Sequence, residues 1–274
     1  MPLFTISQAH IRETARILDI VMPINYARRL TGGLRTVRAD RQLGLALAFI
    51  AGAINAGGFL AVAQYTSHMT GIVSSLADQL ALGAYDLLCG GLGALVAFVF
   101  GAACSSAMVN YARQRRMTSL YALPLLLEAA LLLCFGVFGS RLVSIERLSA
   151  PATVMLLSFI MGLQNAVISK LSKSEIRTTH ITGTVTDIGI ELGRLFYRNA
   201  PGTLPQDKVV TNWVKLRFLA SLATLFFLGG GVGALGFKHV GYLSTIPLAV
   251  LLVVLALVPA IDDATATVRR RIGR

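Results

Sequence analysis

Charged side chains are scarce in this sequence, and acidic ones are the scarcest. Asp, Glu, Lys and Arg together make up 14% of the 274 residues, whereas hydrophobic residues make up 55%. An average soluble domain carries roughly a quarter charged residues, so this composition excludes an ordinary soluble enzyme or binding domain. The mean hydropathy of +0.69 is typical of a helical membrane protein. We therefore expect an all-α fold that crosses the bilayer several times.

Residues suited to catalysis or metal binding are equally few. The three cysteines, Cys89, Cys104 and Cys134, lie in apolar stretches without metal or disulfide spacing, so we interpret them as buried apolar residues. The sequence contains no GxSxG, no HExxH and no phosphate-binding loop. We therefore expect no catalytic residue, no metal and no cofactor, and we do not expect an enzyme.

Basic residues outnumber acidic ones by 25 to 13. Such an excess is common in nucleic-acid-binding proteins, but no basic stripe alternates with aromatic residues here, so we expect no nucleic acid partner. The cations lie instead between the apolar stretches, where they set the orientation of a membrane protein. The expected partner of these apolar stretches is the lipid bilayer.

Six apolar stretches are long enough to cross a membrane. They cover about residues 43–65, 86–111, 118–140, 151–171, 213–236 and 241–261. Each is close to the roughly 20 residues that a spanning helix needs. Two shorter segments, 69–83 and 179–196, carry more polar side chains and are poor candidates for helices that face lipid. We expect these two to be re-entrant or broken helices.

The cations in the loops predict the orientation. If the two short segments also cross, giving eight spans, the loop with Arg113, Arg115 and Arg116 lies outside, against the tendency of cations to stay in the cytoplasm. With six spans, this loop and the 194–217 loop lie inside together with both basic ends of the chain. We therefore predict six spans, with the N- and C-termini in the cytoplasm.

One pattern occurs twice, about 110 residues apart. Its first part reads FIAGAINA over residues 49–56 and FIMGLQNA over 159–166, and its second part reads TSHMTG over 66–71 and TTHITG over 178–183. Five of eight positions match in the first part and four of six in the second. A polar pattern duplicated within apolar segments indicates a duplicated membrane unit, and such units often surround a solute path.

The six-span topology makes this duplication an inverted one. Each half then holds three spans and one short segment, so the second half begins on the opposite side of the membrane, as in many channels and secondary transporters. Eight spans would give a parallel repeat instead. The expected organisation is an Arg-rich N-terminal segment 1–42, a first repeat 43–141, a second repeat 150–262 and a basic tail 263–274.

The repeated polar residues are the first candidates for a solute path. Each short segment begins with the pattern His-x-Thr-Gly, which comprises His68, Thr70, Gly71, His180, Thr182 and Gly183. A threonine hydroxyl can cap the free N–H groups of a helix, and glycine allows a close neighbour. Two helix N-termini that point at one centre favour an anion or a carboxylate. Tight helix packing explains the same residues, and neither role excludes the other.

The two histidines allow several interpretations. They can contact a solute, respond to pH, or form structural hydrogen bonds at a helix interface. A metal or haem site is a weaker interpretation, because two histidines without a nearby cysteine or acidic cluster are a thin ligand set.

Three polar residues lie within predicted spans. Asn55 and Asn165 occupy matching positions in the first span of each half, where an amide either bridges helices or contacts a solute. Glu128 lies near the middle of a span with no basic residue within two turns, and an unpaired charge there costs several kcal/mol. It is either a proton or cation relay or a neutral acid that binds a backbone carbonyl near Pro124.

The second short segment carries its own charges. Asp187, Glu191 and Arg194 are spaced for one helix face, and we expect an ion pair between Glu191 and Arg194, which are three residues apart. Asp187 is a further candidate for the solute path.

On these motifs the chain resembles the YoaK-like family of bacterial integral membrane proteins of unknown function (DUF1275). The likeness rests on the segments GAINA (52–56), SHMTG (67–71), MGLQNA (161–166) and TTHITGTVTD (178–187). It covers roughly residues 43–262. The resemblance implies an inner-membrane location and six or seven spans, but no substrate. One position departs from the family pattern Thr-Gly-Asn: Ile72 follows Gly71 here, which argues against a polar role at that position.

These features favour a small-solute transporter or exporter of the inner membrane, with Glu128 as the residue that would couple it to protons. The alternatives are a non-transporting scaffold or sensor that binds a partner through its Arg-rich N-terminus, and a channel. The solute is unknown, and the sequence leaves open whether the chain forms a homo-oligomer.

Overall fold

Helices make up the regular structure of the part of the chain that the structure describes. This part, in a computed structural model, is residues 37–115, 117, 119–142, 149–171 and 179–257. The helices are α3 (Val37–Val62), α4 (Met69–Ala81), α5 (Tyr85–Gln114), α6 (Ala122–Leu142), α7 (Ser149–Leu171), α8 (Ile181–Phe196), α9 (Trp213–Val240), the 3-10 helix η1 (Gly241–Ser244) and a last helix over residues 245–257. The predicted all-α fold is confirmed.

Five helical segments are long and apolar enough to cross a membrane. They are Asp40–Val62, Tyr85–Gln114, Ala122–Gly139, Pro151–Leu171 and Trp213–Leu257. The last of these contains both the fifth and the sixth predicted stretch, because η1 joins α9 to the helix over 245–257. Helices α4 and α8 have 13 and 16 residues and do not belong to this set. A helix of that length is shorter than the hydrocarbon core, as predicted for the segments 69–83 and 179–196.

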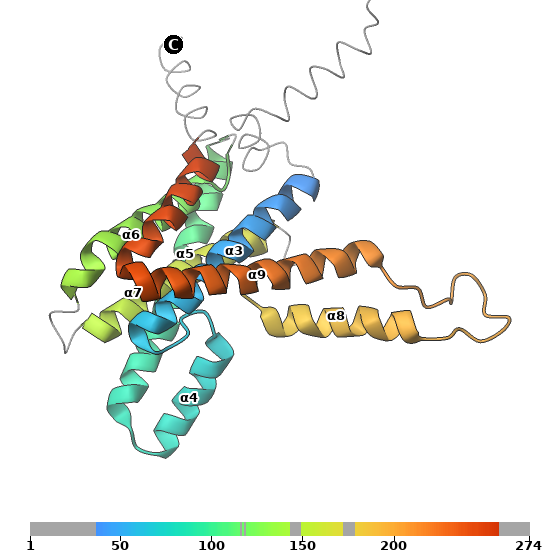
Figure 1. Cartoon of the computed structure of the whole chain (residues 1–274), viewed down its shortest axis with the longest axis horizontal. Helices are drawn as coiled ribbons and strands as arrows, with labels where there is room; N and C mark the ends of the chain where they lie inside the picture. Colours follow the sequence, from blue (N-terminus) through green and yellow to red (C-terminus); the bar gives the residue numbers. More distant parts are fainter. Residues whose placement is uncertain (1–36, 116, 118, 143–148, 172–178, 258–274) are drawn as a thin grey trace, which may run out of the picture.

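Glycines set the main helix contacts, in which α3 packs chiefly against α9 and α7 chiefly against α5 (Figure 1). A Cβ on Gly52 would overlap the carbonyl oxygen of Phe226, and a Cβ on Gly229 would overlap that of Phe49. The same arrangement recurs between α5 and α7, where the pairs are Gly101 with Phe159 and Gly162 with Phe98. Small residues at these points let two backbones touch, which is how membrane helices gain packing energy without a hydrophobic driving force.

Helices α3 and α7 cross near the centre and run in opposite directions. Gln164 donates a hydrogen bond from Nε2 to the carbonyl oxygen of Leu47 at 3.2 Å. At the other end of the contact, a Cβ on Gly58 would lie 2.9 Å from Cδ1 of Leu157. Leu47 precedes Gly58 along α3, whereas Gln164 follows Leu157 along α7, so the two helices are antiparallel.

Two arms project from the helical body (Figure 1). We call α4 with the first part of α5 (residues 69–92) the first arm, and α8, the 197–212 loop and the start of α9 (residues 181–220) the second arm. Figure 1 shows that α4 and α8 both begin near the middle of the molecule and run outward along these arms. The N-termini of the two short helices therefore lie near the centre of the fold.

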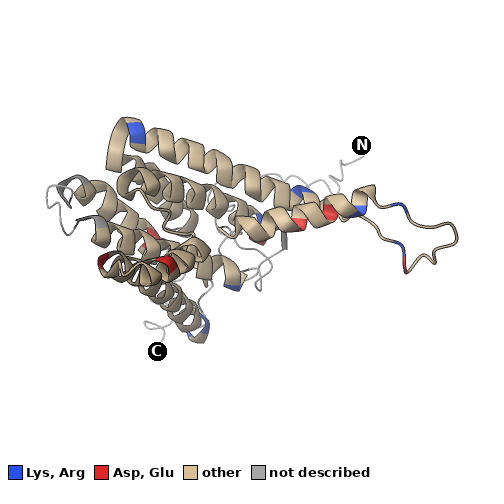
Figure 2. Ribbon diagram, turned by 90° about the horizontal axis from the view of Figure 1, so that it is seen from below, with Lys and Arg blue, Asp and Glu red and all other residues tan. Residues whose placement is uncertain are grey.

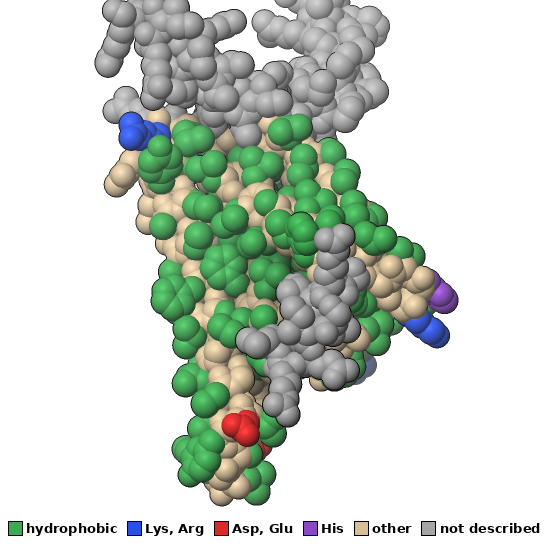
Figure 3. Space-filling model, turned by 90° about the vertical axis from the view of Figure 1, so that its left-hand side faces the viewer, with side chains coloured by type: hydrophobic (Ala, Val, Ile, Leu, Met, Phe, Trp, Pro, Cys, Tyr) green, Lys and Arg blue, Asp and Glu red, His purple; other side chains and the backbone are tan. Residues whose placement is uncertain are grey.

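The body presents an apolar surface. Figure 3 shows one face covered largely by hydrophobic side chains, with the charged groups near its ends. The exposed large hydrophobic residues of α5 and α9 include Val99, Phe100, Phe227 and Val232. A protein in water would hide these side chains, so their exposure agrees with helices that face lipid.

Candidate functional site

The chain reverses after α3 and returns toward the centre before α4 begins. Ala63 ends the helix with φ of 53°, in the left-handed region that closes many helices. Ser67 then donates to Oδ1 of Asn55, from Oγ at 2.8 Å and from its backbone N–H at 3.3 Å. Asn55 lies within α3, seven residues before its end, so the 63–67 loop lies alongside that helix. This return places the start of α4 deep in the fold.

The second copy of the pattern makes the equivalent contact. Thr179 donates from Oγ1 to Oδ1 of Asn165 at 2.6 Å, and Asn165 donates from Nδ2 to the carbonyl oxygen of Met161 at 2.8 Å. In both copies the asparagine therefore bridges its helix to the residue before the histidine. These contacts join each asparagine to the loop before a short helix rather than to a second helix, and Asn165 also lines the central cavity described below, where it can contact a solute.

The histidines, rather than the threonines, occupy the cap positions of the short helices. His68 is the N-cap residue of α4 and His180 that of α8, and neither side chain makes a capping hydrogen bond. Thr70 and Thr182 lie one position inside the first turn, so the predicted capping by their hydroxyls is wrong. The cap role belongs to the residue just before the helix, whose side chain reaches the free N–H groups of the second and third helical residues.

Gly71 and Gly183 make room for the imidazole rings. A Cβ on Gly71 would overlap the ring of His68, and a Cβ on Gly183 would overlap the ring of His180. The close neighbour that the sequence predicted for these glycines is thus the histidine three residues earlier, not another helix. The missing side chain at this position lets each ring lie beside the first turn of its own helix.

The two helix starts meet at a cavity of about 290 Å³. It is lined by Ser67, His68, Met69, Thr70, Phe98, Asn165, Ser169, Thr179, His180 and Thr182. These residues come from both copies of the repeated pattern and bring imidazole, hydroxyl and amide groups together. None of these lining residues is Asp, Glu, Lys or Arg. Among the described residues, the partial positive charge of the two helix N-termini is thus the charge that faces the cavity, and it favours an anionic group.

A second cavity of about 380 Å³ lies on the first-arm side and shares His68. It is lined by Phe59, Val62, Ala63, Gln64, Tyr65, His68, Gly71, Ile72, Ser75 and Gln79. The rings of Phe59 and Tyr65 stack with their centroids 4.5 Å apart and form one wall. His68 therefore lines both cavities, and Ile72 is buried against Ala94 and Val154, in agreement with the doubt that its departure from the family pattern cast on a polar role there.

Glu128 lies apart from these cavities. Its side chain is fully buried in α6, and within the described residues neither carboxyl oxygen has a hydrogen-bond partner. It lines neither of the two cavities. The structure thus brings the histidine patterns together but does not bring Glu128 to them.

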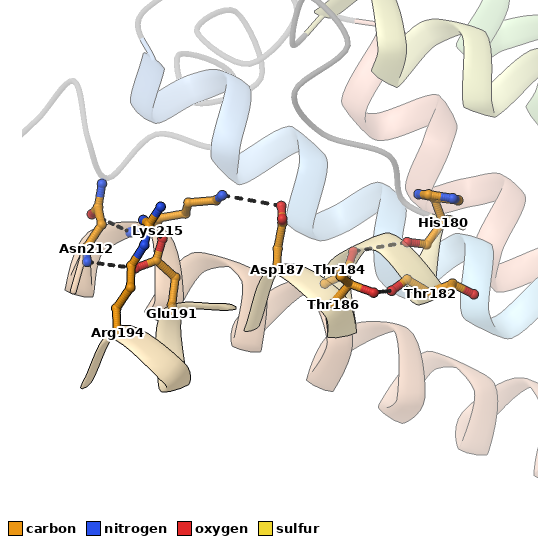
Figure 4. A network of polar contacts seen from close by, with 9 residues as sticks. All are labelled: His180, Thr182, Thr184, Thr186, Asp187, Glu191, Arg194, Asn212 and Lys215. Carbon is orange, nitrogen blue, oxygen red and sulfur yellow. Dashed lines mark hydrogen bonds and ion pairs between the residues drawn. The ribbon is translucent and has the colours of Figure 1, made fainter. Parts of the chain in front are cut away.

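Asp187 holds α8 to α9 rather than lining the central cavity (Figure 4). Its Oδ2 lies 3.4 Å from Nζ of Lys215. The predicted ion pair between Glu191 and Arg194 is confirmed, with Oε1 and Nη1 2.8 Å apart. Glu191 is fully buried, and its Oε2 also accepts a hydrogen bond from the backbone N–H of Asn212 at 2.9 Å.

The sequence did not mark Asn212 and Lys215, which are the partners of Glu191 and Asp187 at the start of α9. Asn212 is the N-cap residue of α9, and its Oδ1 accepts from the backbone N–H of Lys215 at 3.0 Å. An asparagine just before a long apolar run is a recognisable helix start. The contact to Glu191 could not be seen in the sequence, since it depends on α8 lying beside α9.

Comparison with known proteins places the chain in a family. The family model described as "Protein of unknown function (DUF1275)" matches residues 43–258. The chain belongs to the DUF1275 family. The matched region contains both short helices and every residue that lines the central cavity.

A relative from Bacillus subtilis (strain 168) is described as "UPF0700 transmembrane protein YoaK". It is 28% identical over 168 residues, which cover 60% of this chain and 72% of the relative. No solved structure gives a significant match. The apolar helices and the name of this relative support a multi-pass membrane protein, whereas the family description states no function, so a function must be argued from the site.

Proposed function

We propose that this DUF1275 protein is a transporter or exporter of a small solute in the bacterial inner membrane rather than an enzyme. The solute binds in the central cavity, between the N-termini of α4 and α8. One observation carries this proposal: two short helices, each too short to cross the bilayer, begin at a common cavity with His68 and His180 beside it. Broken helices whose ends meet near the centre of a membrane protein are a common form of solute site.

Six spans in an inverted repeat are part of the proposal. The segment Trp213–Leu257 has 45 residues, about 68 Å of helix at 1.5 Å per residue and roughly twice the hydrocarbon thickness. Gly241, with φ of 69°, lies between α9 and the last helix, where such a segment would turn back. The antiparallel crossing of α3 and α7, which carry the first part of each repeat, also supports inversion.

The chemistry of the cavity favours a solute with a carboxylate or another small anionic group. Hydroxyl and imidazole groups can donate hydrogen bonds to such a group, and both helix dipoles present their positive ends to it. An acidic side chain among the lining residues would oppose an anion, and the described lining residues include none.

Proton coupling through Glu128 is a separate part of the proposal. A charge on this buried side chain would cost several kcal/mol unless water or a partner reached it. A proton taken up or released there therefore requires a change of packing around α6, and such a change can accompany transport. Because Glu128 does not line the central cavity, its effect on the solute would be indirect.

The alternative functions have less support in the described residues. A scaffold or sensor would use the Arg-rich segment 1–42, of which residues 1–36 lie outside the described part of the chain. Deleting residues 1–40 distinguishes the scaffold hypothesis from the transporter hypothesis. Loss of the phenotype with retained solute flux favours the scaffold. A channel would use the same central cavity but show no saturable exchange.

Flux measurements on the full chain in proteoliposomes test the proposal. Acetate, lactate and benzoate are suitable carboxylate probes, with acetamide and benzamide as uncharged matches. We expect saturable carboxylate flux in the wild type. In the double variant His68→Ala/His180→Ala this flux should fall at least about tenfold, because losing one charge-assisted hydrogen bond to the solute costs roughly that factor in binding. The matched control is His239→Ala, because His239 is exposed at the end of α9.

Two further variants separate the roles. Glu128→Gln should abolish the dependence of flux on a pH gradient while leaving exchange between identical solutes. Equal flux in wild type and in the double histidine variant would remove the central cavity from the mechanism. Equal pH dependence in wild type and Glu128→Gln would remove Glu128.

A further inference from the structure

We infer that the second arm binds the headgroups of acidic phospholipids, with its tip in the headgroup layer. This inference needs only that the chain lies in a bilayer, and it does not depend on solute transport. Figure 2 shows the second arm projecting from the body, with basic residues along its distal half.

Side chains change along the second arm in the order found across one leaflet of a bilayer. Although α8 carries more polar side chains than the spanning helices, its exposed residues include Val185, Ile190 and Leu192, which suit the hydrocarbon, beside Thr182 and Thr186 nearer its start. Three exposed aromatic residues follow where α8 ends and α9 begins: Phe196, Tyr197 and Trp213. Aromatic rings of this kind gather at the boundary between hydrocarbon and headgroups. The loop beyond them would then lie among the headgroups.

Three cations around the 197–212 loop, two at its base and one in the second turn of α9, are available to bind phosphate. Arg194 and Lys215 are held by Glu191 and Asp187. Within the described residues, no ion-pair partner is recorded for three other exposed cations, Arg198, Lys208 and Arg217. Asp207 is the acidic residue of the 197–212 loop, so the free charge of the tip is positive. Cations in this position attract acidic lipids by roughly 1 kcal/mol each.

The loop that carries two of these cations has a fixed shape. Asn199 donates from Nδ2 to the carbonyl oxygen of Val209 at 3.0 Å, and its Oδ1 accepts from the backbone N–H of Val209 at 2.9 Å. Thr203 closes a turn within the loop by donating from Oγ1 to the carbonyl oxygen of Ala200 at 2.7 Å. The bonds between Asn199 and Val209 join the two ends of the loop, so that Arg198 and Lys208 stay beside each other at its base.

The first arm provides the contrast. Its tip is also apolar and aromatic, with Leu82 and Tyr85 exposed, but its charged residues are Asp78 and Asp86. No Lys or Arg occurs between residues 69 and 112. An apolar tip alone would suit any lipid, whereas cations select acidic headgroups. The basic tip of the second arm is therefore the feature that predicts a lipid preference.

Trp213 allows a direct test, because it is the only tryptophan in the chain. The full chain is placed in bilayers of phosphatidylglycerol and phosphatidylcholine, with bromine labels near the headgroup on one lipid at a time. We expect brominated phosphatidylglycerol to quench Trp213 at least about twofold more strongly than brominated phosphatidylcholine at equal mole fraction. The difference should vanish in 0.5 M salt, where the screening length is only a few ångströms.

Matched variants assign the effect to the tip. Arg198→Gln, Lys208→Gln and Arg217→Gln together should make the two lipids quench equally. The control moves the reporter to the first arm as Trp213→Phe/Tyr85→Trp, and we expect equal quenching by the two lipids there.

Several outcomes would overturn the inference. They are equal quenching of Trp213 by both lipids, a preference that persists in the triple Gln variant, and weak quenching by either lipid because a second copy of the chain covers the arm. Solute flux is measured separately, so its failure would leave the lipid result unaffected.

Discussion

Each histidine of the repeated pattern forms one unit with the glycine that follows it by three positions. The ring of His68 occupies the space where a Cβ of Gly71 would lie, and His180 stands in the same relation to Gly183. The spacing is that of one helical turn, so the ring lies against the first turn of the helix that it precedes. The sequence marked these four residues by repetition. Only the folded structure shows that each glycine leaves room for the imidazole ring three residues before it.

Substituting either glycine tests this unit. We expect Gly183→Ala to displace the imidazole of His180, because the new methyl group overlaps the ring, and so to gain less of the roughly 1 kcal/mol by which alanine stabilises a helix over glycine. Unfolding of the full chain in detergent measures the effect. Gly193→Ala is the matched control on the same helix, since no atom lies within 4 Å of its Cβ position. Equal stability of the two variants would contradict the packing role of Gly183.

Other glycines allow whole helices to touch, because they lie against the backbone of a neighbouring helix instead of a histidine ring. Gly52 in α3 and Gly229 in α9 each lie against a carbonyl oxygen of the opposite helix. Composition and hydropathy predicted that these segments are helices, since a long apolar run has few other structures available in lipid. They did not predict that α3 packs on α9 rather than on its sequence neighbour α4, because several helices in the chain carry glycines at similar spacing.

The contact between α3 and α9 can be broken by one methyl group. We expect Gly229→Ala to destabilise the full chain by about 3 kcal/mol, because its Cβ meets the backbone of Phe49, which cannot rotate away. Gly231→Ala, two residues further along α9, is the control, since its Cβ position is open. Thermal unfolding of both variants in the same detergent gives the comparison. A loss in Gly231→Ala as large as in Gly229→Ala would point to backbone flexibility instead.

At the scale of the whole molecule, the two arms distinguish the proposed topologies. With six spans, the turn between α4 and α5 lies outside and the 197–212 loop lies in the cytoplasm. With eight spans, both lie on the cytoplasmic side. The acidic first arm and the basic second arm fit the first arrangement, because cations are retained on the cytoplasmic side.

Single cysteines at the two arm tips decide between these topologies. In a background where Cys89, Cys104 and Cys134 are replaced by alanine, we expect Gly83→Cys to react with an impermeant maleimide from outside. Gly202→Cys should react only after the cytoplasmic side is opened. Both glycines lie in exposed turns where a Cβ meets no other atom, but their positive φ strains any other residue, so each variant is first checked for wild-type unfolding in detergent. Labelling of both from the same side would restore the eight-span model.

The sequence by itself determined the class of molecule and the residues that matter most. Scarce charge and long apolar runs require helices in a bilayer, since an unsatisfied backbone in hydrocarbon costs several kcal/mol per group. The repeated Asn and His-x-Thr-Gly patterns pointed to several residues of the central cavity, namely His68, Thr70, Asn165, His180 and Thr182, whereas Asn55, Gly71 and Gly183 do not line it. Local spacing also predicted the ion pair between Glu191 and Arg194, because residues three apart on a helix are neighbours.

Only the tertiary structure decided which of these residues meet. The 63–67 loop lies back along α3, so His68 reaches the same cavity as His180, although 112 residues separate them. The same packing leaves Glu128 away from that cavity and ties Asp187 to Lys215. Such contacts join distant segments, and they follow from which helix faces fit together in three dimensions rather than from any local property of the sequence.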